Sequence, residues 1–259
     1  MTMRVARPGA PSHLRVAGDP ATIVTTALVS AVEQLMAHDA AIRRGTSDPE
    51  AIHDARVAVR RIRSHAASLS SVLDVDAISA PVERLGAFAR ALGTVRDLDV
   101  FLEDVPEHTQ LLTTLMAIAV DPPLRRPAHT PDPAVVMSSV WKALARRAGA
   151  ADGSSPDPVL HALRIRAKRV RYAAEALEPF VGDRAAAFAK AAARLQDVLG
   201  RHQDSVVAID KLAAEAAAEP AHAFAAGWIG AGRERVRVQT RAAWPDAWRS
   251  LAKKKRRFW

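Results

Sequence analysis

The sequence predicts an all-α protein: a helical bundle of two four-helix repeats related by pseudo-two-fold symmetry. Hydrophobic residues make up 49% of the 259 residues and aromatic residues only 5%. Alanine dominates the apolar fraction, and such a composition favours helix over sheet. Apolar residues recur at helical spacing through most of the chain. In addition, two blocks of sequence return in the same order about 108 residues later, which indicates an internal repeat.

Four helices are expected in the first half of the chain. The first two begin at the pairs Asp19-Pro20 and Asp48-Pro49, where aspartate is suited to cap a helix and proline to occupy its first position. Proline also stands near the expected starts of the third and fourth helices. From the spacing of apolar residues, these helices cover about residues 20–45, 49–73, 81–102 and 106–116.

A proline-rich linker separates the two halves. Residues 121–133 contain five prolines, and helical spacing resumes only at about residue 134. A second loop, at residues 149–158, is rich in glycine, serine and proline. The remaining helices are expected from about residue 134 to this loop, and at about residues 157–178, 183–214 and 220–241.

These boundaries give the expected domain organisation. Residues 1–19 form an N-terminal extension, residues 20–242 a single domain, and residues 243–259 a basic C-terminal tail. Within the domain, repeat 1 covers about residues 20–120 and repeat 2 about residues 134–242. Two related halves usually pack about a pseudo-two-fold axis, so equivalent helices are expected to line one shared groove.

Several classes of protein are excluded by what the sequence lacks. There is no cysteine, which excludes disulfides, thiolate metal sites and cysteine nucleophiles. The first 20 residues contain no apolar segment of the kind found in signal peptides. No apolar run approaches the roughly 20 residues that a membrane span needs. We therefore expect a cytoplasmic protein with no membrane partner.

The net charge is an argument about partners. The formal charge is +9 and the isoelectric point about 10.7, and such an excess of basic residues favours anionic partners. The run Lys253–Arg257 in the C-terminal tail supplies five of these charges, which leaves 9 − 5 = +4 for the rest. Runs of this kind are usually disordered and nonspecific. The positions of the basic residues therefore carry more information than their number.

The internal repeat contains most of the informative basic residues. Residues 51–63 match residues 159–171, with His53 aligned to His161 at an offset of 108, and Leu92-Gly93-x-x-x-Asp97 matches residues 199–204 at an offset of 107. Projected at 100° per residue, the basic residues of each copy gather in a stripe about 80° wide. The two stripes consist of His53, Arg56, Arg60 and Arg63, and of His161, Arg164, Lys168 and Arg171.

Like charges at these spacings repel one another and destabilise a helix. No Asp or Glu follows four residues later within either stripe, whereas a bound anion would offset the repulsion. Guanidinium groups form bidentate contacts with phosphate oxygens, lysine adds a point charge, and a protonated imidazole donates to an oxyanion. The alternative is that each stripe is only a solvated, charged helix face. The recurrence of the same stripe in the second copy favours a polyanion-binding site.

Other functions fit the sequence less well. Aromatic residues are nearly absent from the basic helices, Tyr172 being the only one near them, which disfavours base stacking by a nucleic-acid binder. There is no Gly-x-x-x-x-Gly-Lys-[Ser/Thr] loop and no His-Glu-x-x-His motif, which disfavours a metal-dependent hydrolase. We expect no catalytic residue and no cofactor. Asp97 and Asp204 are expected to pair with arginines of neighbouring helices; the alternative is that Asp97, Asp99 and Asp204 hold a divalent cation.

At this point the motifs resemble those of the CHAD domain, a histidine-bearing α-helical domain of two four-helix repeats. Three blocks of sequence carry the resemblance: His53-x-x-Arg56-x-x-x-Arg60-Arg61-x-Arg63, Leu92-Gly93-x-x-Arg96-Asp97-x-Asp99, and the second copy from His161-x-x-Arg164 onward. The resemblance covers about residues 20–240 and implies a basic central groove. It also implies inorganic polyphosphate as the ligand and, in some members, association with polyphosphate granules.

Carried over residue by residue, the resemblance places all eight residues of the two stripes in the groove. Members of this family often follow a triphosphate-tunnel (CYTH) domain, for which residues 1–19 leave no room, so the chain is either a stand-alone member or a piece of a longer protein. Gln203 replaces the arginine of the Arg96-Asp97 pair in the second copy, so an asymmetric site is expected. Further candidates for the groove are Arg43, Arg44, Arg61, Arg96, Arg169, Lys190 and Arg194.

Overall fold

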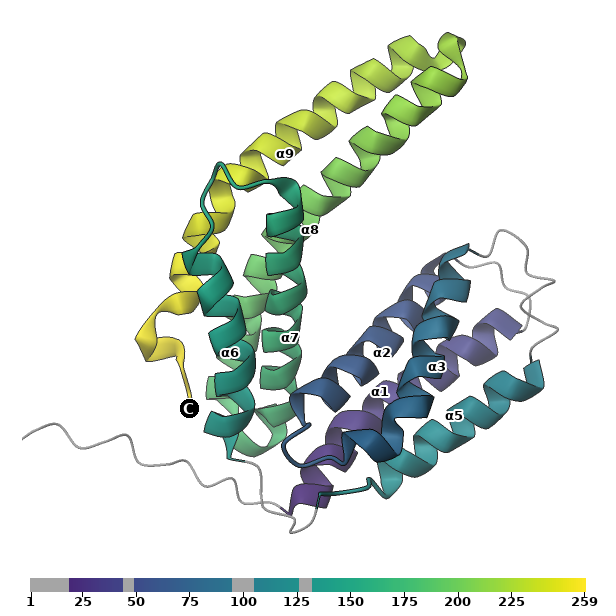
Figure 1. Ribbon diagram of the computed structural model, residues 1–259, viewed down its shortest axis with the longest axis vertical. Coiled ribbons are helices and arrows are strands. Elements are labelled where there is room, and N and C mark those ends of the chain that lie inside the picture. The colour runs from purple at the N-terminus through teal and green to yellow at the C-terminus, as the bar shows by residue number, and fades with distance from the viewer. Residues whose placement is uncertain (1–18, 44–48, 95–104, 126–131) are drawn as a thin grey trace, which may run out of the picture.

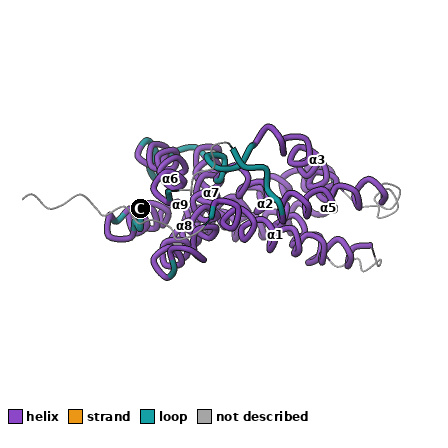
Figure 2. Tube along the Cα trace, turned by 90° about the horizontal axis from the view of Figure 1, so that it is seen from below, coloured by secondary structure: helices purple, strands orange, loops and turns teal. Residues whose placement is uncertain are grey.

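A computed structural model of the protein describes residues 19–43, 49–94, 105–125 and 132–259. Within these ranges every regular element is a helix, apart from one isolated β-bridge. The helices form two bundles that lie side by side (Figures 1 and 2). The expected all-α architecture of two four-helix halves is therefore confirmed.

Within the residues that the structure describes, the first bundle consists of four antiparallel helices. They are α1 (Pro20–Arg43), α2 (Pro49–Ser68), α3 (Val75–Thr94) and α5 (Val105–Val120). Each packs against its neighbour in the chain or across the bundle, so that their apolar faces meet in one core. The buried side chains at its centre include Ile23, Leu35, Val59, Leu69, Leu85 and Leu115.

Helix α1 corrects one expectation of the sequence analysis. Its segment Pro20–Ala40 is long and apolar enough to cross a membrane by length and composition alone, although no run of this length was expected. In the structure, Val24, Leu28 and Val32 of this helix are buried in the first core. The helix is apolar because α2 and α5 pack against it.

Helix α3 begins earlier than the sequence predicts. The helix starts at Val75 and contains Pro81, which had been expected near its beginning. The reason is a cap: the Asp74 carboxylate accepts hydrogen bonds from the backbone N–H groups of Asp76, at 3.2 Å, and Ala77, at 3.4 Å. The chain before this cap is also held, because Leu73 and Leu124 form the isolated bridge between the α2–α3 connection and the linker.

The second bundle is built from longer helices. Its elements are α6 (Pro133–Gly149), α7 (Asp157–Val181), α8 (Asp183–Ala218), the short 3-10 helix η1 (Pro220–His222), α9 (Ala223–Ala252) and the 3-10 helix η2 (Lys254–Arg256). Helices α8 and α9 pair along their lengths, and their distal parts extend beyond the bundle as a two-helix arm (Figure 1). We use "the arm" below for the distal α8–η1–α9 hairpin, residues 206–240.

The C-terminal tail is not the flexible segment that its lysines and arginines predict. Phe258 is buried, with its ring 5.8 Å from that of Phe188, and Trp259 packs against Phe188 at 4.9 Å between ring centroids. Arg257 lies over the ring of Trp141 at 4.7 Å. The aromatic residues at the end of the tail fasten it to the second bundle, and the charge run before them could not indicate this.

Candidate functional site

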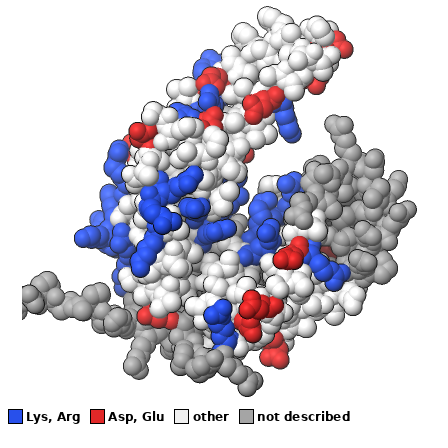
Figure 3. All heavy atoms as spheres, viewed as in Figure 1, with Lys and Arg blue, Asp and Glu red and all other residues white. Residues whose placement is uncertain are grey.

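The two basic helices of the repeat, α2 and α7, contact each other where the two bundles meet. Lys and Arg side chains gather on the surfaces beside this junction (Figure 3). A cavity of about 490 Å³ opens there, between α2, α3 and α7, and we call it the α2–α7 groove. Its basic lining consists of Arg60, Arg63, Arg164, Lys168 and Arg169.

The groove has an apolar side as well as a cationic one. Helix α3 contributes Val75, Ile78 and Val82 to the lining, and Ser64 and Ser79 add hydroxyl groups. Apolar walls displace water and so strengthen the electrostatic attraction between the cations and an anion placed among them. The arrangement therefore suits an elongated anion with oxygen atoms along one side.

The cations in the groove act on one another. Burial, and then the positive charges of Arg164, Arg60 and Arg171, lower the pKa of Lys168 to about 8. Burial also lowers the pKa of Arg60, with smaller contributions from Arg56 and Arg164 in the same direction. Positive charges from both repeats are thus close enough to destabilise each other's charged state. A bound anion would relieve this repulsion.

Two guanidinium groups at the centre of the groove have unused hydrogen-bonding capacity. The buried Nε atoms of Arg60 and Arg164 have no hydrogen-bond partner among the described residues. Arg164 lies against α8 at Gly200, where an added Cβ would be 3.4 Å from Nε of the arginine. The glycine that the repeat highlighted therefore gives Arg164 its place beside the groove.

Not every residue of the two stripes faces the groove in the same way. Nε of Arg171 is 3.1 Å from a carboxylate oxygen of Glu175, and the Arg171 guanidinium lies 4.8 Å from the Tyr172 ring. The expectation that no acidic residue compensates Arg171 is wrong, because Glu175 follows it at i+4. Arg61, which projects away from the stripe, donates to Gln34 at 3.2 Å and lies 3.9 Å from Glu175.

The ends of the stripes are more open. His53, Arg56 and Arg63 are exposed on α2, and of these only Arg63 lines the groove. His161 is half-buried on α7, and its buried Nδ1 has no hydrogen-bond partner among the described residues. Arg56 lies close enough to Arg60 to affect its pKa. The structure therefore brings the central members of both stripes together and leaves the two histidines outside the cavity.

The further candidates divide into three groups. Arg169 lines the groove although the projection set it apart, while Lys190 and Arg194 are exposed on α8 outside the cavity lining. Arg44 and Arg96 lie outside the described residues, as does the side chain of Arg43 at the end of α1. The lining of the groove is thus defined by α2, α3 and α7.

The two aspartates of the repeat have different outcomes. Asp97 and Asp99 lie outside the described residues. Asp204 is exposed on α8, and its charge raises the pKa of Lys168. Its expected pairing with an arginine stays a prediction. Within the described ranges, no group of three or more histidine and acidic side chains is placed to hold a metal ion.

A half-buried polar cluster at the base of the arm was not expected from the sequence. Asp157, in the first turn of α7, pairs with Arg237 at 2.8 Å and with Arg241, both on α9. His202 of α8 is buried, with Nε2 3.3 Å from the same carboxylate. Burial alone would raise the pKa of Asp157, but the hydrogen bond and charge of Arg237 outweigh it and lower the pKa. The cluster ties α7, α8 and α9 together, so a structural role explains His202.

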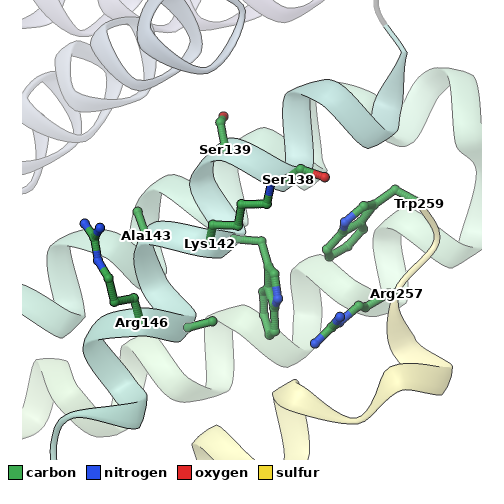
Figure 4. A pocket seen from close by; sticks show the side chains of 9 residues that line it. Ser138, Ser139, Lys142, Ala143, Arg146, Arg257 and Trp259 are labelled. Atoms are coloured by element: carbon green, nitrogen blue, oxygen red, sulfur yellow. The ribbon is translucent and has the colours of Figure 1, made fainter.

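A second basic cavity lies on the far side of α6. It measures about 670 Å³ and is lined by residues of α6 and the C-terminal tail (Figure 4). Lys142 and Arg146 are exposed on α6, while Arg257 and Trp259 come from the tail. Because Arg257 is already stacked on Trp141, this cavity has fewer uncompensated cations than the α2–α7 groove.

Comparison with known proteins connects this geometry to one family. The family model of the CHAD domain matches residues 26–112 and 104–213 of the chain. Among curated proteins, the chain is 28% identical over 246 residues to two uncharacterized proteins of Mycobacterium tuberculosis, MT2285 of strain CDC 1551 / Oshkosh and Rv2226 of strain ATCC 25618 / H37Rv. The matches cover 77% of this chain and 46% of each relative, so the chain spans about half the length of these proteins.

Two solved structures share the fold. PptA from Streptomyces chartreusis superimposes with a TM-score of 0.65 at 18% identity, over 90% of this chain and 100% of that one. The crystal structure of the CHAD domain from the plant Ricinus communis gives a TM-score of 0.63 at 24% identity, over 95% of this chain and 97% of that one. At these identities the likeness establishes a common fold.

Proposed function

The chain belongs to the CHAD domain family, and from this premise we propose that it binds inorganic polyphosphate in the α2–α7 groove. The observation that carries the proposal is the group of mutually repelling cations that the two repeats bring to one cavity. Arg60, Arg164 and Lys168 line this cavity together, and the pKa of Lys168 is lowered to about 8. The choice of polyphosphate among polyanions rests on the family resemblance.

A flexible polyphosphate chain suits this cavity for physical reasons. Each phosphate offers oxygen atoms to bidentate guanidinium groups, and successive phosphates can satisfy cations along the groove. Binding would also release condensed counterions, as it does for nucleic acids, so the affinity should fall steeply as salt is added. We propose a non-catalytic role in the cytoplasm, including targeting to polyphosphate granules.

Polyphosphate binding by a double charge reversal tests the proposal. The Arg60→Glu/Lys168→Glu variant should lose at least about a hundredfold in affinity, because each charge-assisted contact contributes about 1.5–3 kcal/mol. The matched control is Lys211→Glu/Arg249→Glu, which makes the same change in net charge at exposed positions outside the groove. Equal affinities for a folded groove variant and this control would contradict the proposed site.

Competition with nucleic acid separates polyphosphate from its nearest alternative. Tyr172, the aromatic residue in the groove lining, is buried and has the guanidinium groups of Arg61 and Arg171 over its ring, so no base can lie on it. Single-stranded DNA or RNA should therefore displace polyphosphate only at a large excess of phosphate groups. Displacement at equal phosphate concentration would favour a general polyanion binder. Released phosphate in the presence of magnesium or manganese would instead indicate hydrolysis.

A further inference from the structure

The outer face of α9 on the arm carries a stripe of exposed residues with heptad spacing. Positions 224, 228, 231, 235, 238 and 242 alternate steps of four and three residues, and the burial pattern leaves all six exposed. The side chains of Phe224, Trp228 and Val238 are 85%, 76% and 56% exposed, respectively. We call this surface the outer α9 stripe; it consists of Phe224, Trp228, Ala231, Arg235, Val238 and Ala242.

The opposite face of the same helix is already used. Ala226, Thr240 and Trp244 of α9 are buried, about half a turn of the helix away from the outer stripe. This inner face packs against α8 along the length of the arm. Figure 1 shows α9 on the side of the arm that points away from the first bundle. The outer stripe is therefore a second apolar seam, open to solvent and turned away from the α2–α7 groove.

Glycines beside the outer stripe are not explained by packing within the chain. A Cβ atom added at Gly227 or Gly232, which flank the stripe, would meet nothing within 4 Å. Each glycine in a helix interior costs about 1 kcal/mol relative to alanine, so these two weaken the arm without any benefit inside the protomer. Small residues of this kind allow another helix to approach closely.

We infer that the outer α9 stripe is the interface of a homodimer in which two arms pair antiparallel about a two-fold axis. When the two-fold axis passes between residues 229 and 230, Trp228 faces the small Ala231 of the second copy, and Phe224 faces Arg235. The first contact fits a large side chain against a small one, and the second is a cation–π pair. Parallel pairing would instead place Arg235 against Arg235 and Trp228 against Trp228. The stripe therefore complements its own antiparallel copy, as a two-fold interface requires.

The area supports a reversible dimer. Covering the four exposed aromatic rings of two arms removes roughly 600 Å² of surface, since each ring buries about 150–250 Å² when fully covered. The aliphatic parts of Val238 and Arg235 and the flanking helix backbone add to this value. The total lies below the 1,200–2,000 Å² that stable interfaces bury and in the range of weak, transient complexes, so a dimer with a Kd of about 10 µM is expected. The dimer would hold two α2–α7 grooves on one particle.

Sedimentation equilibrium of the purified protein tests the dimer. Wild-type protein at about 0.1 mM should have a mass of twice 27.8 kDa, because a dimer with a Kd of about 10 µM is mostly formed there. The Phe224→Glu/Trp228→Glu variant should be monomeric with an unchanged helical circular-dichroism spectrum. The matched control is Val135→Glu, which places a charge on an exposed valine of α6 outside the arm and should remain dimeric. A monomeric wild type, or a dimer that survives the double change, would overturn the inference.

Single cysteines determine the orientation of the arms and do not depend on the folding of the glutamate variant. The chain has no cysteine of its own, so each variant has one thiol. Ala231→Cys lies near the proposed axis and should form a disulfide-linked dimer on mild oxidation. Ala242→Cys should not, because antiparallel pairing places its two copies about 37 Å apart along the helix axis. Cross-linking of both variants would indicate parallel arms and overturn the arrangement. Neither test involves polyphosphate, so its failure leaves the proposed function untouched.

Discussion

The two sides of the α2–α7 contact both carry Arg or Lys side chains, but in the part of the chain that the structure describes only one side also carries an acidic partner for them. On the groove side, Arg60, Arg164 and Lys168 face one another with no acidic side chain lining the cavity within the described residues. On the other side, Arg61 and Arg171 both lie within 4 Å of Glu175, and both guanidinium groups lie over Tyr172. One side is compensated by the protein itself, and the other is left for a ligand.

This difference separates residues that stabilise the fold from residues that can bind an anion. Burial raises the pKa of Glu175, and the charges of Arg171 and Arg61 oppose this shift, as expected for a carboxylate that has lost water and gained cationic partners. His65 lies on the same side, buried with a pKa lowered to about 4, and so stays neutral. The compensated side holds the two bundles together, whereas the groove side is destabilising until an anion binds.

The largest expected effect is a difference in polyphosphate affinity between alanine variants of two arginines, one on each side of the α2–α7 contact. Arg164→Ala should weaken polyphosphate binding by about tenfold to a hundredfold, the value of one charge-assisted contact, with little change in stability. Arg61→Ala should lower stability, because it removes the contacts with Gln34 and Tyr172, and leave affinity within about threefold. Titration calorimetry and thermal unfolding of both variants measure this. Similar losses of affinity would show that the compensated side also contacts the ligand.

The next effect is a dependence of binding on pH that arises from Lys168. Its pKa in the free groove is lowered to about 8, and a bound polyanion would raise it again. Binding should therefore take up a proton near pH 8.5, and the affinity should fall about tenfold between pH 7.5 and 9.5. Calorimetry in buffers of different ionisation enthalpy measures the proton uptake. Lys168→Arg keeps its positive charge over this pH range and should therefore abolish most of the proton uptake.

The lowered pKa of Lys168 affects the stability of the ligand-free protein in the opposite direction: stability rises with pH where affinity falls. Because the folded-state pKa of Lys168 lies below its ordinary value of 10.5, the unfolded chain binds more protons between about pH 8 and 10.5. The contribution of Lys168 to stability therefore rises with pH in this window, while affinity falls. Thermal unfolding of ligand-free wild type and Lys168→Met across this pH range measures the effect. If the unfolding midpoints of the two proteins depend on pH in the same way, the lowered pKa of Lys168 is contradicted.

Much of this arrangement could be read from the sequence, and the reason is periodicity. The repeat identified α2 and α7 as equivalent helices, and a projection at 100° per residue placed Arg60, Arg164 and Lys168 on one side and Arg61 on another. Both inferences use only spacing within a helix, which local geometry determines. The binding role of these residues stays a prediction until the groove variants are measured.

The remaining features depend on contacts between distant segments. Arg61 contacts Gln34 of α1 and Glu175 and Tyr172 of α7, and these contacts form only when α2 lies against both helices. The ion pair of Arg171 with Glu175 is instead local to α7, at i+4, and the sequence contains it. The tail carries a charge run typical of disorder, yet its last two residues pack on Phe188, about 70 residues earlier in the chain. A helical projection treats each helix alone, so it cannot show which cations a neighbouring helix will pair.

A smaller effect is expected from Glu175, which compensates two cations at once. Glu175→Gln leaves Arg61 and Arg171 without their shared carboxylate, and the side chain is only 29% exposed. Because the pKa of Glu175 is raised, burial outweighs the attraction of the two arginines, so the charged carboxylate gains little from folding. The free energy of unfolding should therefore fall by less than about 1 kcal/mol, well below the 3–5 kcal/mol seen when fully buried pairs are broken. For a protein of this size the unfolding midpoint should drop by less than about 4 °C. Affinity for polyphosphate should be unchanged or raised, since two cations become available.

The smallest effect is expected at Gly200, where two substitutions distinguish a change in helix packing from a change in polyphosphate binding. In Gly200→Ala the new methyl group would meet Arg164 at 3.4 Å, an ordinary contact, and alanine favours helix by up to about 1 kcal/mol. This variant should be as stable as wild type or slightly more so, with affinity within about twofold. Gly200→Leu places further carbon atoms where the guanidinium lies, so Arg164 must move and affinity should fall towards that of Arg164→Ala. If the leucine variant binds as wild type does, the position of Arg164 against α8 does not matter for the groove, and the contrast between its two sides rests on charge alone.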